Sequence, residues 1–419
     1  MKTLWILDAH TSEPKYGGIS RQYDFATELS KRGYNVIVIA SSYSHFTKNY
    51  FTDDEFKISE INSRVHFVYL RTKPEYKGNG FDRLLNMLSF VSLVKKHRAK
   101  IVKKFGKPDV VTGCSIHPFA WVAAFQTAKK YKARFCIEVR DLWPQILVQN
   151  NELSRFHPFV IFLGSLEKWA YKRAEKIIYS MTYGDKYICD KLGFSKEKTY
   201  WIGQPMDCER YDNYAESKKE LIPIEIRNFM KDSFVCVFAG YYIKYEGVYI
   251  MLEAAKKLQD NGIPIKMLFV GSGFEYEGML DYVKENKLDN VFVGPRINRE
   301  CIPSLLKASQ ICMAHLAHEG NQVFEYGLSK NKINDYLYSG TCTIFGYGQK
   351  NDPVATSNAG YVIEPNNVEA LFNKIVEVYN MPEIEREKLG ENGRTYIQNN
   401  HKVQILGDKL EKILFESIN

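Results

Sequence analysis

Short runs of apolar and β-branched residues recur along the first half of the chain. They are residues 4–7, 35–40, 65–70, 109–112 and 134–139, and segments of helical spacing such as 20–32 separate them. Strands that alternate with helices in this way are typical of a parallel sheet with helices on both faces. The first half therefore predicts one doubly wound, Rossmann-like α/β domain.

The second half repeats the pattern after a polar interval at 208–232. Its apolar runs are residues 234–240, 265–273, 291–294, 311–316, 341–346 and 360–363. We predict a first domain at 1–207, a linker at 208–232, a second Rossmann-like domain at 233–400 and a helix at 401–419. Ligands of doubly wound sheets bind beyond the carboxyl ends of the strands, so we expect the two domains to face a shared crevice.

Length and composition agree with two folded domains. The chain has 419 residues, of which 45% are apolar and 25% charged. A chain of this length exceeds the usual size of a domain with a single hydrophobic core. Neither a signal-peptide pattern nor a run of about 18 apolar residues occurs. We expect a cytoplasmic protein whose membrane contact is peripheral. The eight cysteines are scattered without a C-x-x-C pair, which predicts buried, reduced thiols and no zinc site.

The positive charge of the chain is unevenly distributed. The net charge of +8 is modest and does not indicate a nucleic-acid partner, but the stretch from Arg83 to Lys107 contains no acid. Its apolar positions have helical spacing and its other face is basic. The segment is either a helix packed on the core with a solvated lysine face, or a helix that contacts anionic lipid.

Glycines follow several predicted strands. Gly17 and Gly18 come after the first strand, and Gly240 and Gly271 come after two strands of the second half. Glycine lets the backbone approach a phosphate, and the next helix offers free N–H groups to the anion. The spacing around Gly17 is not G-x-G-x-x-G, which disfavours a dinucleotide cofactor.

The stretch from Glu319 to Gly340 concentrates polar and glycine residues ahead of a predicted helix. Ser329 is a candidate N-cap, which would leave the first amides of the helix for a phosphate. Lys332 adds a positive charge there, and Asp335 lies one turn further on the same face, where a carboxylate suits a ribose diol. A capped surface helix with a Lys–Asp pair has the same pattern.

The whole chain resembles glycosyltransferase family 4, in the branch of L-fucosaminyltransferase-like enzymes of capsule and O-antigen synthesis. In the second half the matching pieces are FAGYYIKYEGVYIMLEAAKKL, FVGSGFEYEGML, VFVGPRINRECIPSLLKAS and YGLSKNKINDYLYSGTCTIFG; in the first half they are GGISRQYDFATELSKRGYNVIVIASSYSH, IEVRDLWPQ and SLEKWAYKRAEKIIYSM. The resemblance implies the GT-B fold, in which two Rossmann-like domains face a cleft.

The resemblance also implies roles for individual residues. Asp335 matches the second glutamate of the family's E-x7-E pair, which binds the donor ribose, and Glu325 lies near the first in a shifted frame. Relatives place arginine and lysine where this chain has Tyr241 and Glu246, so Lys332 and then Lys244 are the candidate replacements that would neutralise the diphosphate. The other implied donor-binding residues are Arg296, Tyr326, Gly327, Leu328 and Asn331.

In the first domain many relatives carry histidine and aspartate where this chain has Arg140 and Asp141. Arg140 would stabilise the leaving diphosphate and Asp141 would orient the acceptor hydroxyl, although a buried Arg–Asp pair that only fixes the domain is the alternative. His117, at the start of a helix, is expected on the acceptor side as a cap or packing group.

The reaction implied by the resemblance is a retaining, metal-independent transfer from a UDP-sugar to a lipid-linked or saccharide acceptor, with no cofactor. The absence of a D-x-D dipeptide and of a clustered His, Cys and carboxylate set agrees with this expectation. Two alternatives stay open at this point: a nucleotide-sugar 2-epimerase of the same fold, and a non-catalytic partner that only binds a nucleotide sugar.

Overall fold

The computed structural model describes residues 2–45, 47–78, 80–115, 117–149, 153–316, 325–349 and 352–416. The chain divides into two compact units. Unit 1 comprises Met1–Pro205, Gln322–Ser329 and Val403–Asn419, and unit 2 comprises Met206–Asn321 and Lys330–Lys402. The division after Pro205 lies close to the boundary predicted after residue 207.

Unit 1 is built on an eight-stranded sheet in the order β3-β4-β2-β1-β5-β6-β7-β8. Every pairing is parallel except that of β3 with β4. The strands are β1 (Thr3–Leu7), β2 (Asn35–Ser41), β3 (Phe56–Asn62), β4 (Val65–Leu70), β5 (Val110–Cys114), β6 (Arg134–Val139), β7 (Lys176–Tyr179) and β8 (Thr199–Trp201). All five apolar runs predicted as strands are confirmed.

Strand β3 was not predicted from the sequence, because it lies at the edge of the sheet. Its residues FKISEIN are all half-buried or exposed, so it has no continuous apolar run. The central strand β1 is buried at every position, as expected for a parallel strand covered on both faces.

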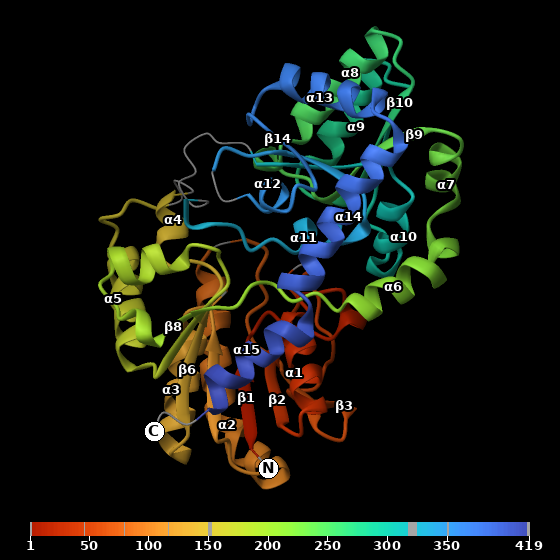
Figure 1. Cartoon of the computed structure of the whole chain (residues 1–419). Helices are drawn as coiled ribbons and strands as arrows, with labels where there is room; N and C mark the ends of the chain where they lie inside the picture. The colour runs from red at the N-terminus through yellow and green to blue at the C-terminus, as the bar shows by residue number, and fades with distance from the viewer. Residues whose placement is uncertain are drawn as a thin grey trace. The chain divides into compact units, whose positions relative to one another are not determined.

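Helices cover both faces of the unit 1 sheet (Figure 1). Helices α2 (Phe81–Phe105), α3 (Phe119–Tyr131) and α5 (Pro158–Arg173) supply one core cluster, and α1 (Arg21–Lys31) and α15 (Val403–Phe415) supply another. Leu406, Leu410 and Leu414 of α15 join Phe25 and Leu29 of α1 in the second cluster. The predicted C-terminal helix therefore exists and completes the core of unit 1. The short α4 (Gln145–Gln149) precedes α5.

Unit 2 contains a six-stranded, wholly parallel sheet in the order β11-β10-β9-β12-β13-β14. The strands are β9 (Phe234–Tyr241), β10 (Ile265–Ser272), β11 (Val291–Gly294), β12 (Ile311–His315), β13 (Cys342–Gly346) and β14 (Gly360–Ile363). All six predicted strands of this half are present. The core on one face comes from α8 (Val248–Asp260), α9 (Tyr276–Glu285) and α13 (Val368–Asn380).

The remaining helices of unit 2 are α6 (Cys208–Ser217), α7 (Ile224–Met230), α10 (Ile302–Lys307), α11 (Asn331–Ser339), α12 (Pro353–Ser357) and α14 (Glu383–Asn400). Helices α6 and α7 occupy the interval predicted as a linker, so that prediction is wrong in its local structure. Tyr211 of α6 is buried and its hydroxyl donates to the Asp335 carbonyl, and Asp212 pairs with Arg394 of α14 at 2.8 Å. These long-range contacts hold a polar sequence that lacks an apolar repeat.

Two further predictions concern the cysteines and membrane-spanning helices. All eight cysteines are free and buried. Within the described ranges, no helix combines the length and apolar character needed to cross a bilayer.

Candidate functional site

Each sheet has a point where the strand order reverses. In doubly wound folds, ligands bind at this point, beyond the carboxyl ends of the strands. In unit 1 the reversal lies between β1 and β5, and in unit 2 it lies between β9 and β12. The residues that follow these strands form two sets, one in each unit.

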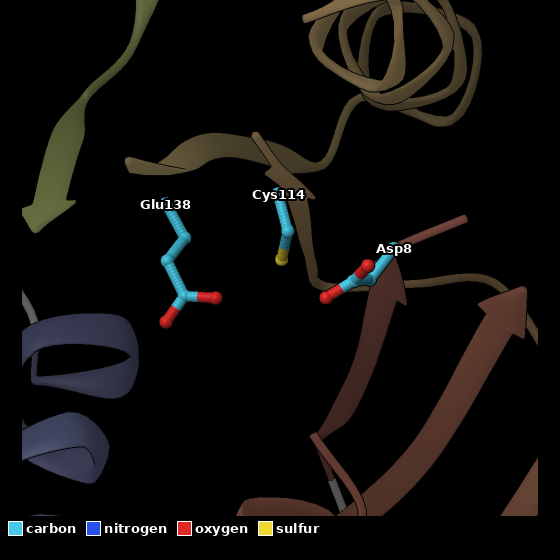
Figure 2. Close-up of side chains that lie close together, drawn as sticks. All are labelled: Asp8, Cys114 and Glu138. Atoms are coloured by element: carbon cyan, nitrogen blue, oxygen red, sulfur yellow. The ribbon is translucent and has the colours of Figure 1, made fainter. Parts of the chain in front are cut away.

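Unit 1 has a buried charge network at this point. Asp8 follows β1, Cys114 ends β5 and Glu138 lies on β6, and Figure 2 shows the two carboxylates on either side of the Cys114 sulfur. The Arg21 Nη2 lies 2.8 Å from Glu138 Oε1, and the Arg140 Nη1 lies 3.4 Å from Asp8 Oδ2. Two buried acids thus face two buried arginines and the charges balance.

The pKa values of the two carboxyls move in opposite directions. Burial raises the pKa of Asp8, and Arg140 offsets this only in part. Burial would also raise the pKa of Glu138, but Arg21 and Arg140 outweigh it and hold the value below its ordinary range.

The oxygen and sulfur ligand atoms of Asp8, Cys114 and Glu138 lie within 4.8 Å of one another. The set nevertheless does not fit a metal ion. Guanidinium groups already pair with both carboxylates, and burial raises the pKa of Cys114 well above its ordinary value, which keeps it a thiol. The ion pairs explain why these three residues lie together, so the network does not indicate a metal site. Metal independence of the reaction itself stays a prediction.

Arg140 and Asp141, the predicted catalytic pair, follow β6. Arg140 is buried, and its backbone N–H donates to Ser115 Oγ at 3.0 Å. The carbonyl oxygen of Asp141 accepts from Ser115 Oγ at 3.3 Å. Arg140 forms its salt bridge with Asp8, whereas the sequence offered Asp141 as the partner. Their catalytic roles stay predictions.

The glycines after β1 lie in a turn, and their approach to a phosphate stays a prediction. Gly17 has φ 66°, a left-handed conformation that glycine adopts without strain. A Cβ at Gly18 would collide with the Ser12 hydroxyl. His117 is buried just before α3, and its Nδ1 accepts from the Ala120 N–H at 3.2 Å. This hydrogen bond agrees with a cap or packing role for His117, although Pro118 holds the N-cap position of α3. Its place on the acceptor side stays a prediction.

The segment Glu325–Ser329 groups with unit 1, whereas we expected it in the nucleotide-binding domain. The ring of Tyr326 is buried in the unit 1 core, 5.3 Å from that of Tyr187, and the Tyr183 N–H donates to the Tyr326 carbonyl. Glu325 is exposed. Gly327 is buried and Leu328 half-buried, and residues 319–324 of the predicted stretch lie outside the described residues.

The prediction that Ser329 caps the next helix is wrong. Helix α11 begins at Asn331 with Lys330 at the N-cap position, and no side chain caps it. The Ser329 hydroxyl donates to Ser180 Oγ at 2.8 Å and accepts from Gln204 Nε2 at 2.8 Å. These partners within unit 1 draw the serine away from the helix amides.

In unit 2, glycines bring the carboxyl ends of β9 and β10 together. Gly240 and Gly271 are register partners, and the Gly240 carbonyl oxygen stands where a Cβ of residue 271 would lie. The Nζ atom of Lys332 lies 3.4 Å from the position of a Cβ at residue 240. The structure therefore places Lys332 directly beside the predicted phosphate-facing glycine.

Glu246 holds this lysine and a second one. Its carboxylate is buried and forms ion pairs with Lys332 and with Lys330, the latter at 2.6 Å. Burial would raise the pKa of Glu246, but the two lysines outweigh it and lower the value; burial lowers the pKa of Lys332. One acid between two lysines leaves a net charge of +1.

The other predicted donor residues lie around this cluster on unit 2. Tyr241 is the last residue of β9 and Lys244 follows it, and both are exposed, as is Arg296 after β11. Asn331 is the first residue of α11, and Asp335 follows one turn later, half-buried. Their contacts with a donor stay predictions.

Four charged residues of these clusters were missed by sequence reasoning. Lys330 directly precedes α11 in unit 2, and in unit 1 Asp8 follows β1, Arg21 begins α1 and Glu138 lies on β6. Asp8 directly after the first strand was the available signal. The others could not be singled out, because their partners are distant in the sequence.

Comparisons with known proteins agree with both halves. The family model "Glycosyltransferase Family 4" matches residues 16–210, and the model "Glycosyl transferases group 1" matches residues 223–396. The chain is a family 4 glycosyltransferase. It is thus a transferase enzyme, which decides against the epimerase and the non-catalytic partner.

A curated relative is the Staphylococcus aureus capsular polysaccharide biosynthesis glycosyltransferase CapM, which is 22% identical and matched over 80% of this chain and 81% of that protein. Among solved structures, Thermosynechococcus elongatus sucrose-phosphate synthase matches with a TM-score of 0.70 and 15% identity, over 99% of this chain and 98% of the other. Anabaena HepE in complex with UDP-glucose matches with 0.65 and 13%, over 99% of both chains. An E. coli trehalose-6-phosphate protein bound with UDP-2-fluoro glucose matches with 0.73 and 8%, over 100% of both. These neighbours confirm the predicted GT-B fold.

Proposed function

We propose that this family 4 enzyme is a retaining, metal-independent transferase that uses a UDP-sugar as donor. It transfers an N-acetylated amino or deoxy sugar to a lipid-linked or saccharide acceptor during bacterial surface polysaccharide synthesis. The name of the CapM relative and the UDP-sugars named for two structural neighbours support the substrate classes.

The observation that carries this proposal is the cluster of Lys330, Glu246 and Lys332 at the carboxyl end of β9. A nucleoside diphosphate needs positive charge as the sugar leaves, and preorganised donors in a shielded site supply it best. Lys332 beside Gly240 and the first amides of α11 offer that charge. Lys330 and Lys332 would thus replace the basic residues that relatives carry at positions 241 and 246.

In this reaction the acceptor hydroxyl oxygen forms a bond to the anomeric carbon on the face from which the nucleotide departs. The bond from the anomeric carbon to the diphosphate oxygen breaks, and its electron pair stays on UDP. The hydroxyl proton passes to a diphosphate oxygen. Lys332 stabilises the negative charge of the leaving group, and Asp335 holds the ribose.

Transfer from a panel of UDP-sugars to polyprenyl-diphosphate-linked and free saccharide acceptors tests the proposal. We expect Lys332→Ala to lower kcat/KM by about 10- to 100-fold, the cost of losing one charge-assisted hydrogen bond of about 1.5–3 kcal/mol. The matched control is Lys256→Ala, which removes a half-buried surface lysine of α8 that pairs with Asp260. Full activity in both Lys332→Ala and Asp335→Ala would remove this segment from the donor site. Loss of activity in EDTA would contradict metal independence.

The basic helix α2 supports a peripheral contact with anionic membrane, which we propose as a second property. Phe90, Val94 and Ile101 pack it on the unit 1 core, so the packed-helix interpretation holds. Its other face carries exposed basic residues, and the exposed apolar side chains of unit 1 include Phe81 and Leu88 on α2 and Phe156, Ile161 and Phe162 at α5. Apolar side chains near a lysine face are typical of interfacial contact.

Co-sedimentation with anionic vesicles measures this contact. We expect binding that weakens between about 0.05 and 0.5 M salt. It should also weaken when Lys95, Lys100 and Lys103 are changed to glutamine. Neutral vesicles are the control, and equal binding to both vesicle types would count against a contact through α2.

A further inference from the structure

His315 lies at the carboxyl edge of the unit 2 sheet, where the strand order reverses. It is the last residue of β12, which pairs with β9, and only 1% of its surface is exposed. Two glycines enclose its ring, because a Cβ at Gly247 or at Gly346 would collide with the imidazole. The ring therefore fills the whole space between these two backbone positions.

The two glycines belong to different elements. Gly346 ends β13 and is the register partner of His315. Gly247 has φ 67°, a left-handed conformation that glycine adopts without strain, and it is the N-cap residue of α8, directly after the 3-10 turn Lys244–Glu246. His315 thus packs between the end of β13 and the turn that carries Glu246.

A hydrogen bond fixes the orientation of the ring. The backbone N–H of Asn366, in the loop between β14 and α13, donates to His315 Nε2 at 3.0 Å, whereas Asn366 Oδ1 is 3.5 Å from the same nitrogen. Because Nε2 accepts the shorter bond, the neutral imidazole carries its hydrogen on Nδ1. His315 therefore ties a third backbone segment to the same point.

The imidazole is neutral in its buried position. Burial lowers the pKa of His315 below its ordinary value, and the hydrogen bond with Asn366 and the charge of Glu246 act against this, while Lys332 acts in the same direction. A neutral ring leaves Nε2 free to accept the Asn366 N–H, which a protonated ring could not do. The influence of Glu246 and Lys332 also shows that both charges lie near the ring.

The second ring nitrogen has no structural use. Nδ1 of His315 is buried and has no hydrogen-bond partner within the described part of the chain. A buried donor without a partner is destabilising, and a phenylalanine ring would fill the same space without it. Local departures from the most stable choice are expected at functional sites, and this one lies at the ligand edge of the sheet.

The turn held by His315 leads directly to the donor-side charges. Glu246 precedes Gly247, and its buried carboxylate forms the ion pairs with Lys330 and Lys332. Because Glu246 and Gly247 share a rigid peptide unit, a displacement of Gly247 also displaces Glu246. The two ammonium groups would then lose the partner that holds them.

We propose that His315 is a positioning residue for the donor diphosphate. By holding Gly247 against the end of β13, it keeps Glu246 in place, and Glu246 in turn keeps Lys332 where it neutralises the diphosphate. This inference rests on the proposed transferase function and adds a residue that acts on the donor only through Glu246 and Lys332.

Binding of UDP by calorimetry tests the inference without turnover. We expect His315→Phe, which keeps a ring but loses the acceptor for the Asn366 N–H, to raise the Kd of UDP about 10-fold. His315→Gln, whose amide oxygen can accept that N–H, should stay within about 3-fold of the parent. Uridine lacks the diphosphate, so its Kd should be the same in the parent and in His315→Phe.

Two further variants separate positioning from a loss of stability. Leu258→Ala removes a fully buried side chain near the other end of α8, so it should lower the Tm and leave the Kd of UDP unchanged. Gly346→Ala places a methyl group against the imidazole from the β13 side and should raise the Kd of UDP as His315→Phe does. Unchanged UDP binding in Gly346→Ala would contradict the role of the ring.

A double-mutant cycle with Lys332→Ala shows whether His315 acts through the lysine. When Lys332 is already absent, His315→Phe should raise the Kd of UDP by less than about 3-fold, because residues that act through one another are not additive. Additive effects overturn the inference, since His315 would then act independently of Lys332.

The remaining outcomes are also decisive. Equal UDP affinity in the parent and His315→Phe overturns the inference alone, and so does equal weakening of UDP and uridine. A loss of UDP affinity in Leu258→Ala as large as that in His315→Phe assigns the effect to stability instead. Absence of UDP binding in the parent overturns the proposed donor and this inference together. Absence of transfer from every UDP-sugar, with the expected binding pattern intact, contradicts the proposed function alone.

Discussion

At the scale of single residues, the donor-side charges of unit 2 depend on one buried carboxylate. Glu246 stands where relatives carry a basic residue. Its carboxylate forms ion pairs with Lys330 and Lys332 and so holds both lysines in place. Breaking a buried pair by neutralising one member leaves the other charges without compensation, which is costlier than losing the pair as a whole. Glu246 is therefore expected to matter for stability as well as for donor binding.

Glu246→Gln should lower the free energy of unfolding by about 3 kcal/mol at pH 7. Because the folded pKa of Glu246 is lowered, its stabilisation is present above the ordinary carboxyl pKa and is lost as the pH falls through the folded value. Urea denaturation at pH 7 and pH 4 measures the change. Glu253→Gln, an exposed carboxyl on α8, is the control; equal effects of the two variants would contradict the role of the pair.

A second residue-scale prediction concerns Glu167 in the core of unit 1. Burial raises its pKa to about 8, and the hydroxyls of Tyr171 and Tyr187 donate to it at 3.0 and 3.1 Å. Between the ordinary value of the unfolded chain and about 8, the folded state holds a proton that the unfolded state lacks, so stability falls as the pH rises.

Glu167→Gln should therefore lose less stability than the parent protein between pH 5 and pH 8. The limit is about 1.4 kcal/mol for each pH unit in that window. Tm values measured across the window for both proteins give the difference, and parallel profiles would show that Glu167 does not titrate there.

At the scale of elements, α15 shows how a helix at the end of the chain completes the core of unit 1. Leu406 is fully buried against α1 and the sheet. Leu406→Ala should lower the free energy of unfolding by about 2–5 kcal/mol, because the lost burial adds to the cost of a cavity. Chemical denaturation measures it, with exposed Lys412→Ala on the same helix as control. A loss no larger than that of the control would mean that α15 is not part of the core.

At the scale of the whole molecule, each unit has hydrophobic clusters of its own. Chains with more than one core commonly unfold in more than one step. We expect the calorimetric enthalpy of unfolding to exceed the van't Hoff enthalpy. UDP at 100 times its Kd should stabilise the unit that binds it by about 2.7 kcal/mol. Equal enthalpies in the absence of ligand would show one cooperative transition instead.

The sequence by itself determined the elements that bury apolar runs. Central parallel strands such as β1, β2, β9 and β10 are apolar on both faces, and their alternation with helices specifies two doubly wound sheets. The family motifs added the enzyme class. The glycines after β1 and β9 also indicated where the backbone makes a turn or a close approach, because few other residues fit such positions.

Only the tertiary structure decided which charges meet. Glu246 and Lys332 are 86 positions apart, and Arg21 and Glu138 are 117 apart, so no local spacing reveals either pair. The same holds for Ser329, whose partners Ser180 and Gln204 override its preference for an N-cap. Apolar periodicity is a local property of the chain, whereas ion pairs and the packing of His315 between Gly247 and Gly346 depend on which strand ends become neighbours in the folded sheet.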